Sequence, residues 1–238
     1  MLVIAVCAII MSFGPLFGQG TTLIGLGNVS QPPITVAPGQ IVTLLVSNSK
    51  TVLPPLSSFQ RATTLPLPTS LAGFSVSIRD YTGTHPAAIL AIGQSPLCQN
   101  PRTSPDCLMT ALQIQIPFEL TWSEEPPTGV DLIVNDNGTQ SEPFMLAARL
   151  DNIHVLTTCE ISGGGLSNGV WAAFPPCTGL VQHADGSLVS SQSPAEAGEV
   201  VVIYAQGMGR TVPAVKTGVA TPPPHLYWVG RHRSVLAR

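Results

Sequence analysis

Hydrophobic and polar residues alternate along much of the chain with a period of two. In "FSVSIRD" the apolar residues Phe74, Val76 and Ile78 occupy every second position. The same spacing recurs in "LQIQI", from Leu112 to Ile116. Successive side chains of a strand point to opposite faces, so each stretch places one face on a core and the other in water. The pattern predicts strands at Gly39–Ser47, Ala72–Asp80, Pro86–Gly93, Ala111–Phe118, Gly129–Gly138 and Glu142–Leu150.

Turn-forming residues separate nearly all of these predicted strands. The sequence "NDNG", Asn135 to Gly138, predicts a hairpin, because Asn and Gly tolerate the positive φ of a type I′ turn. No convincing long amphipathic helix interrupts the strands, so the Gly-x-Gly at Gly25 is not expected to bind a dinucleotide, which needs a βαβ crossover. Short strands at this spacing favour an all-β sandwich over a parallel α/β sheet.

A later segment repeats the layout of the first predicted strand. The sequence "EAGEVVVIYAQGMG" has a turn, an apolar run at Val200–Ala205 and a glycine turn, as does "VAPGQIVTLLVSNS" from Val36. This shared order indicates a second β-domain that begins near Val181. Because its run is apolar at every position, we expect Val200–Ala205 to be a central strand, buried on both faces.

Composition agrees with an all-β globular protein. The chain has 238 residues, of which 44% are hydrophobic, enough to bury a sizeable core. Only 10% are charged, whereas 22 Gly and 23 Pro supply many turns. The formal net charge of -3 gives no basis for nucleic-acid binding. The basic residues from Arg210 to Arg238 are expected to form a solvated end, with no partner attached to them.

The N-terminal segment predicts export. Leu2–Phe17 is largely apolar, and the following Gly18–Gly20 has the small-x-small pattern that a signal peptidase cleaves. We therefore expect removal of residues 1–20, a mature chain beginning near Thr21, and no stable membrane span afterwards. No Lys or Arg precedes the apolar run, so an uncleaved anchor and a buried strand pair behind a misassigned start are alternatives.

The cysteines agree with an extracellular or periplasmic location. Removal of the leader takes Cys7 away and leaves two close pairs. Pairing within each pair, Cys98 with Cys107 and Cys159 with Cys177, would close two loop-like stretches, and each bridge would contribute about 2–4 kcal/mol. The alternative is a metal site, but no Cys-x-x-Cys spacing occurs and the histidines are scattered. We expect no metal and no other cofactor.

Several blocks of the chain resemble one family. They include "LPTSLAGFSVSI", "LQIQIPFEL", "TGVDLIVNDNGTQSEPFML" and "HADGSLVSSQSPAEAGEVVVIYAQGMG", followed by "PAVKTGVATPP". Over Pro33–Pro223 the chain resembles the Solibacter-type uncharacterised C-terminal domain found in secreted acidobacterial proteins. The resemblance implies a pair of immunoglobulin-like, or IPT/TIG-like, β-sandwiches outside the cell. It brings no established activity and no catalytic residues.

The chain departs from this family in two places. The loop between Cys98 and Cys107 looks like an insertion, and after Pro224 the sequence reads "HLYWVGRHRSVLAR" and stops, where the family would continue with several more strands. We expect a signal peptide at 1–20, an immunoglobulin-like β-sandwich at 21–155, a disulfide-closed connector at 156–180, and an incomplete second sandwich with a basic tail at 181–238. A truncated gene model is the alternative. If the gene model is correct as written, the Val200–Ala205 strand has to pair with the first domain or with another chain.

Candidate catalytic residues are few. The adjacent Glu124 and Glu125 lie in a Pro-rich turn and are expected to point apart, whereas a glycosidase needs carboxylates that face each other. His85, His154 and His183 could each act as a base, but no Gly-x-Ser-x-Gly elbow supplies a nucleophile. We expect these histidines to lie on a surface or at an interface.

Candidate binding residues are equally sparse. Calcium could use Asp131, Asp136 and Asp185, but the alternating ligand spacing of a calcium loop is missing. The stretch Ser162–Gly169 could form an anion-binding nest or a flexible disulfide-closed loop. A glycan could stack on exposed aromatic rings, although burial is the simpler expectation for the available side chains: Trp122, Trp171, Trp228 and the three tyrosines, of which Tyr227 adjoins Trp228.

The sequence therefore predicts a secreted, non-catalytic β-sandwich module. Its role would be structural or adhesive, at the cell surface or in an extracellular assembly, with loops that contact an unknown extracellular protein or glycan. The loops expected to do so are Cys98–Cys107 and Cys159–Cys177. A carbohydrate-binding accessory module and a secreted hydrolase are the alternatives, because a sandwich fold alone does not specify a function.

Overall fold

The computed structural model describes residues 22–27, 34–47, 49, 51, 53, 60–96, 108–121, 128–157, 178–220 and 228–229. Within these ranges the protein is all-β and contains no helix, as the alternating pattern predicts. Consequently, no helix in the described ranges has the length and apolar character needed to cross a membrane. The predicted leader at 1–20 and all the cysteines lie outside the described residues.

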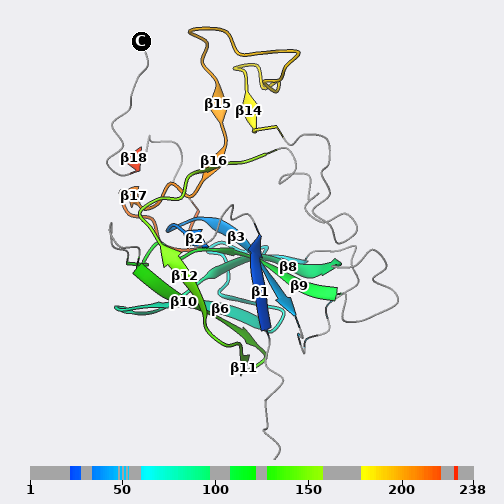
Figure 1. The fold of residues 1–238 in the computed structure, drawn as a ribbon, viewed down its shortest axis with the longest axis vertical. Helices are drawn as coiled ribbons and strands as arrows, with labels where there is room; N and C mark the ends of the chain where they lie inside the picture. The colour runs from blue at the N-terminus through cyan, green and yellow to red at the C-terminus, as the bar shows by residue number, and fades with distance from the viewer. Residues whose placement is uncertain are drawn as a thin grey trace, which may run out of the picture.

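Two sheets form the main body (Figure 1). The first sheet has five strands, in the order β1 (Thr22–Gly27), β3 (Ile41–Ser47), β9 (Leu108–Gln115), β8 (Ala88–Pro96) and β4 (Gln60–Arg61). Its neighbouring strands are all antiparallel.

The second sheet has seven strands. Its order is β2 (Thr35–Val36), β12 (Phe144–Ala148), β10 (Thr128–Asp136), β6 (Phe74–Asp80) and β5 (Ser70–Leu71), with β11 (Thr139–Gln140) on β10 and β7 (Gly83–Pro86) on β6. Only the β2–β12 pair is parallel. Two such sheets packed on one core are consistent with the predicted β-sandwich.

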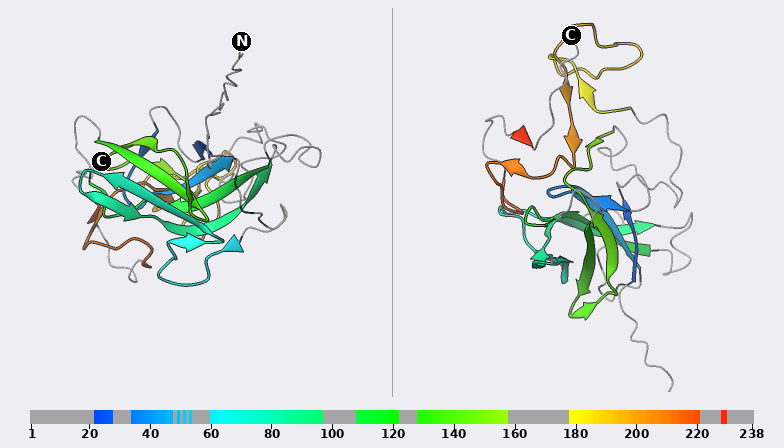
Figure 2. Two further views of the ribbon diagram at one scale, coloured as in Figure 1. Left: turned by 90° about the horizontal axis from the view of Figure 1, so that it is seen from below. Right: turned by 60° about the vertical axis from the view of Figure 1, so that its left-hand side comes forward.

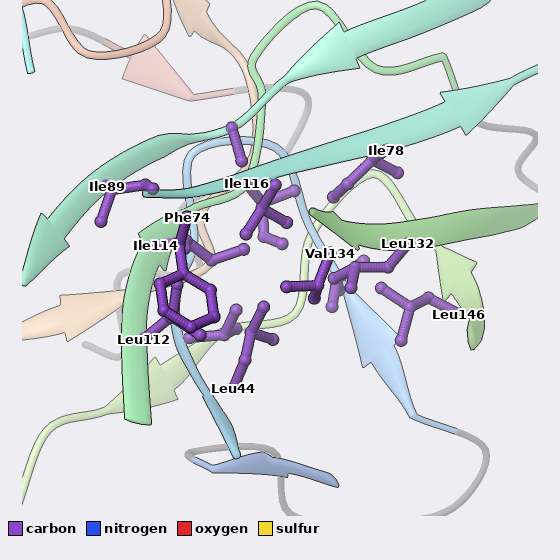
Figure 3. Packing of buried hydrophobic residues seen from close by; sticks show 14 of the residues in the cluster. Leu44, Phe74, Ile78, Ile89, Leu112, Ile114, Ile116, Leu132, Val134 and Leu146 are labelled. Atoms are coloured by element: carbon purple, nitrogen blue, oxygen red, sulfur yellow. The ribbon is translucent and has the colours of Figure 1, made fainter. Parts of the chain in front are cut away.

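The core lies between the inner faces of the two sheets (Figure 3). Leu44 and Leu112 come from the first sheet, and Phe74 and Leu132 come from the second. All four side chains are completely buried. Each fully buried residue of this size contributes about 1.5–3 kcal/mol through removal of apolar surface from water. The alternation read from the sequence is therefore the physical basis of the fold.

The predicted strands of this body are confirmed, with ends that differ by a few residues from the expected ones. The predicted hairpin is confirmed too, since Asp136 pairs with Thr139 across a two-residue turn. Both turn residues, Asn137 and Gly138, have positive φ angles, 48° and 86°, as a type I′ turn requires.

The rest of the described chain forms short two-stranded pairs. They are β13 (His154–Val155) with β16 (Ala205–Gln206), β14 (Val181–Gln182) with β15 (Val202–Ile203), and β17 (Thr211–Val212) with β18 (Trp228–Val229). The segment that carries β14 and β15 projects away from the two sheets (Figures 1 and 2).

The prediction of a buried central strand at Val200–Ala205 is wrong. Only Val202–Ile203 and Ala205–Gln206 pair as strands, and Val200 is 77% exposed. The apolar run predicted burial, but no second layer of the described chain covers these side chains. Within the described chain this segment pairs with β14 through β15 and with β13 through β16.

Candidate interaction surface

Three chain segments meet where the projecting region joins the two sheets. Their backbones form a closed ring of hydrogen bonds: Leu156 N donates to Tyr204 O (2.9 Å), Tyr204 N donates to Leu180 O (3.1 Å), and Leu180 N donates to Leu156 O (2.6 Å). At this ring the strand partners change, from β13 and β16 on one side to β14 and β15 on the other. We call residues 153–157, 178–182 and 200–208 together the apolar ribbon.

The apolar ribbon exposes several hydrophobic side chains. In β15, Val202 is 47% exposed and its neighbour Ile203 is 57% exposed. Because adjacent residues of a strand point to opposite faces, both faces of β15 reach solvent. The other exposed hydrophobic residues of the ribbon are Ile153, Val155, Val200, Tyr204 and Met208. Clustered exposed apolar side chains mark interaction surfaces more often than single ones do.

The motif Gly-Met-Gly at residues 207–209 attaches the ribbon to the segment that follows β12. A Cβ on Gly207 would lie 2.1 Å from Asn152 O, and a Cβ on Gly209 would lie 2.0 Å from Leu150 O. Only glycine permits this close approach of two backbones. Asn152 N donates to Gly207 O at 2.7 Å, which fixes the contact. The two glycines are therefore explained by packing.

Arg210 extends the attachment to the loop after β9. Its guanidinium donates to Phe118 O from Nε (3.1 Å) and to Leu120 O from Nη2 (2.6 Å). These carbonyl groups lie in the loop that follows β9. A planar guanidinium with several donors suits such a cluster of carbonyl oxygens. Arg210 thus holds the base of the ribbon against the first sheet.

Thr217 and Glu119 form a further contact between the same two regions. Thr217 Oγ1 donates to Glu119 Oε2 at 2.5 Å and accepts from Phe118 N at 2.8 Å. Burial alone would raise the pKa of Glu119, but the hydrogen bonds from Thr217 outweigh it and hold that pKa below its usual value. Leu67 N also donates to Gly218 O at 2.7 Å. The ribbon is therefore carried by a segment that is bonded to the sandwich at several points.

The loop from residue 183 to residue 199 forms the far end of the projecting region. His183 follows β14, and Glu199 precedes the exposed run at Val200. The two side chains meet, with His183 Nδ1 2.5 Å from Glu199 Oε1. The other ring nitrogen, Nε2, lies 3.2 Å from both the carbonyl oxygen and the hydroxyl oxygen of Ser193. His183 therefore bridges two points of its own loop.

The contacts join Ser193, His183 and Glu199 in the order of a hydrolase triad, but they differ from those of a catalytic base. A carboxylate only accepts hydrogen bonds, so Nδ1 of His183 donates to Glu199, whereas Nε2 can either donate to the Ser193 carbonyl or accept from the Ser193 hydroxyl. The hydrogen bond to Glu199 raises the pKa of His183 and so favours the imidazolium, in which Nε2 donates to the carbonyl and cannot take a proton from Ser193. In addition, Ser193 N donates to Ser190 O at 3.2 Å and is not directed at an oxyanion. The arrangement fits a loop contact better than a nucleophile.

The three aspartates considered for calcium are not brought together. Asp131 pairs with Arg79 at 2.7 Å, Asp136 accepts a hydrogen bond from Ser49 Oγ at 3.3 Å, and Asp185 accepts from Ser187 in its own turn. In the described ranges, no group of three or more His, Cys, Asp or Glu residues is placed to hold a metal ion. Each of these aspartates has a structural partner instead.

Asp80 is a buried carboxylate that sequence reasoning missed. Its side chain is completely buried, and Oδ1 accepts from Thr82 N at 2.7 Å, while Oδ2 accepts from Thr121 N at 2.9 Å. His85 Nε2 lies 3.2 Å from Oδ1. Burial by itself raises the pKa of Asp80, but hydrogen bonds from Thr82 and Thr121 hold it far below the usual value. This carboxylate joins the β6–β7 hairpin to the loop after β9.

The remaining predicted residues are placed as follows. His85 lies on β7 and His154 lies on β13, where it pairs with Gln206. Since His183 lies in the loop beyond β14, the three histidines belong to different elements. Glu124, Glu125, Ser162–Gly169, Trp122, Trp171, Tyr227 and the cysteines Cys98, Cys107, Cys159 and Cys177 lie outside the described residues, and so do both loops expected to bind a partner.

Fold and surface together define an all-β protein with an exposed apolar ribbon. Comparison of the chain with protein-family models and with curated proteins found no match. The resemblance to the Solibacter-type domain therefore stays a prediction.

Proposed function

We propose that this protein is a secreted, non-catalytic β-sandwich module of the immunoglobulin-like type, which binds a partner at the cell surface or in an extracellular assembly. The observation that carries the proposal is the exposure of Val200, Val202 and Ile203 on a ribbon bonded to the sandwich. Exposed aliphatic side chains are costly in water, and a partner that covers them gains about 25 cal/mol for each Å² of apolar area. The sandwich serves as the rigid support.

The partner that fits this surface best is a protein with an extended apolar segment. The ribbon strands share only two residue pairs in each ladder, and exposed strands bind by adding a further strand. A glycan is a poorer fit, because sugar rings stack on flat aromatic faces and Tyr204 is the one aromatic residue in the described ribbon. We therefore place the binding function on the ribbon and not on the two cysteine loops.

The proposal includes the organisation predicted from the sequence. A partial second β-domain starting near Val181 would expose side chains that a complete sandwich buries, which is the condition found at Val200–Tyr204. Its later part, around Arg210 and Thr217, is bonded to the first sandwich. The pairs Cys98 with Cys107 and Cys159 with Cys177 are proposed to be disulfides, as expected for an exported protein.

Surface binding tests the proposal directly. The full chain, labelled with a fluorophore, is added to intact cells of the producing organism, and bound label is measured against protein concentration. Val202→Asp combined with Ile203→Asp places two charges on the ribbon without touching the core, so saturable binding is expected to fall by more than tenfold, about 1.4 kcal/mol or more. Met145→Asp is the control, since Met145 is 73% exposed on β12, outside the ribbon.

The outcomes separate the candidate functions. Loss of binding in the ribbon variant, with binding kept by Met145→Asp, supports the proposal. Equal binding of both variants contradicts it. Retention of both variants on cell-surface polysaccharide would favour the carbohydrate-binding alternative instead.

A further inference from the structure

The ribbon strand β15 is held by few contacts on the side of the 183–199 loop. It shares two residue pairs with β14, Gln182 with Val202 and Val181 with Ile203. A two-stranded ladder of this length is marginally stable in water. Other contacts at the loop end therefore decide whether the exposed run beginning at Val200 keeps its conformation.

The contact of His183 with Glu199 is placed to do this. His183 directly follows β14, and Glu199 directly precedes Val200, so their side chains join the two strands beyond the last backbone pair. The His183 side chain is 13% exposed and that of Glu199 is 24% exposed. Glu199 Oε2 also accepts from Glu196 N at 2.9 Å, which folds the end of the loop onto the same carboxylate.

We propose that His183 and Glu199 form a pH-dependent latch that keeps the segment Val200–Tyr204 in its binding conformation, an inference that rests on the proposed function for its regulatory meaning. The closed latch is strongest with a doubly protonated imidazole, because Nδ1 then forms an ion pair with the Glu199 carboxylate and Nε2 donates to the Ser193 carbonyl. When Nε2 loses its proton, it can no longer donate to the Ser193 carbonyl, and Glu199 loses its cationic partner, while the Ser193 hydroxyl can still donate to Nε2 at 3.2 Å. The latch is then weakened.

The surrounding charges set the direction of the response. The hydrogen bond to Glu199, with that to Ser193 O, raises the pKa of His183 above its ordinary 6.5, and the charge of Asp185 adds to the effect. The Glu196 N–H, followed by His183, lowers the pKa of Glu199 below its ordinary 4.5. Glu199, Asp185 and Glu196 are thus the acidic groups at the latch.

These directions define a window for the closed state. Because the pKa of His183 is raised, this residue stabilises the closed latch fully below pH 6.5. That stabilisation is lost as the pH rises through the pKa of folded His183. Because the pKa of Glu199 is lowered, this residue stabilises the closed latch above pH 4.5. That stabilisation is lost as the pH falls through the pKa of folded Glu199. The ribbon is therefore held most firmly under mildly acidic to neutral conditions and less firmly under alkaline ones.

Amide hydrogen exchange of the full chain between pH 5.5 and pH 9 tests the latch without a partner. The readouts are Glu196 N, bonded to Glu199 in the loop, and Val189 N, which ties the loop to Val181 O on β14, after correction for the intrinsic pH dependence of exchange. Between pH 6.5 and the pKa of folded His183, protection of these amides is expected to fall by up to about tenfold per pH unit and then to level off, because the stabilisation is lost together with the proton. Thr121 N, bonded to Asp80, is the reference amide in the sandwich.

Two variants and one control complete the test. His183→Gln removes the titrating group, and Glu199→Gln removes its charged acceptor, so each is expected to abolish the pH slope at Glu196 N. His85→Gln removes a histidine from β7 and is expected to leave the slope unchanged. A flat wild-type profile, or a slope that persists in His183→Gln, overturns the latch.

The same variants separate the latch from the proposed function. If surface binding needs Val202 and Ile203 but is equally strong at pH 6 and pH 9, the latch fails as a regulator and the binding surface stands. If exchange follows the predicted slope but the ribbon variant Val202→Asp with Ile203→Asp binds cells normally, the proposed function fails and the latch remains a property of the loop alone.

Discussion

Replacement of Asp80 by Asn is expected to destabilise the sandwich by about 3 kcal/mol. Asn keeps one carbonyl oxygen, which can serve the hairpin donors Thr82 N and Gly83 N. Its amide nitrogen replaces Oδ2, which accepts from Thr121 N at 2.9 Å and from Thr121 Oγ1 at 2.7 Å. Hydrogen bonds to a charged group contribute about 1.5–3 kcal/mol each, and the estimate takes the lower value for each bond. The estimate therefore corresponds to the loss of the two Thr121 bonds.

Urea unfolding followed by circular dichroism at pH 7 measures this loss. Asp185→Asn is the matched control, because Asp185 accepts from Ser187 N and Ser187 Oγ in a turn of the same kind. That turn is exposed and joins no distant segment, so a change below about 0.5 kcal/mol is expected. A loss below about 1 kcal/mol for Asp80→Asn, or an equal loss in both variants, would refute the reasoning.

The pH dependence gives a second check on the same carboxylate. Because the pKa of folded Asp80 is lowered, the Asp80 carboxylate stabilises the folded state above pH 3.8, its ordinary pKa. That stabilisation is lost as the pH falls through the folded pKa. The difference in unfolding free energy between wild type and Asp80→Asn is therefore expected to shrink in strongly acidic solution. A difference that grows on acidification would show that the charge is not stabilising.

Three further outcomes are expected. Gly207→Ala should destabilise the ribbon base by about 2 kcal/mol or more, because the alanine Cβ would overlap Asn152 O at 2.1 Å. Thermal unfolding measures this loss, and unchanged stability would contradict the close approach. Arg210→Ala removes the bonds from Arg210 to Phe118 O and Leu120 O and so loosens the attachment of the ribbon. Hydrogen exchange at Asn152 N should become about tenfold faster, while Thr121 N keeps its protection. Unchanged exchange at Asn152 N would contradict this. Intact mass of the exported protein, with and without thiol alkylation, should show removal of residues 1–20 and no free thiol; a retained Met1 with free thiols would contradict export.

The strands of the main body were predictable because burial there is a local pattern. Val42, Leu44 and Val46 alternate with half-buried neighbours, and all three are completely buried in β3. The hairpin at Asn137 was predictable for a similar reason, since positive φ is a property of the residue type. In both cases the information lies in a few adjacent residues.

The ribbon and the latch were not predictable in this way. The exposure of Val200 depends on whether a second layer covers it, and an apolar run is the same in either case. His183 was expected to be a surface or interface histidine, but its partner Glu199 is sixteen residues away and is reached only once the loop is folded. The buried Asp80 likewise depends on Thr121, which comes from a different strand connection. Contacts between distant residues need the fold before they can be named.

Site-specific photo-crosslinking from Ile203 tests the central claim most directly. The full chain, with a benzophenone side chain at position 203, is irradiated on intact cells of the producing organism, and a second protein carries the same group at Tyr81, which is 76% exposed outside the ribbon. The account predicts one protein adduct of discrete mass from position 203, suppressed by excess unlabelled wild type, and no such adduct from position 81. The same adducts from both positions, or none from position 203, would contradict the claim that the ribbon is the binding surface.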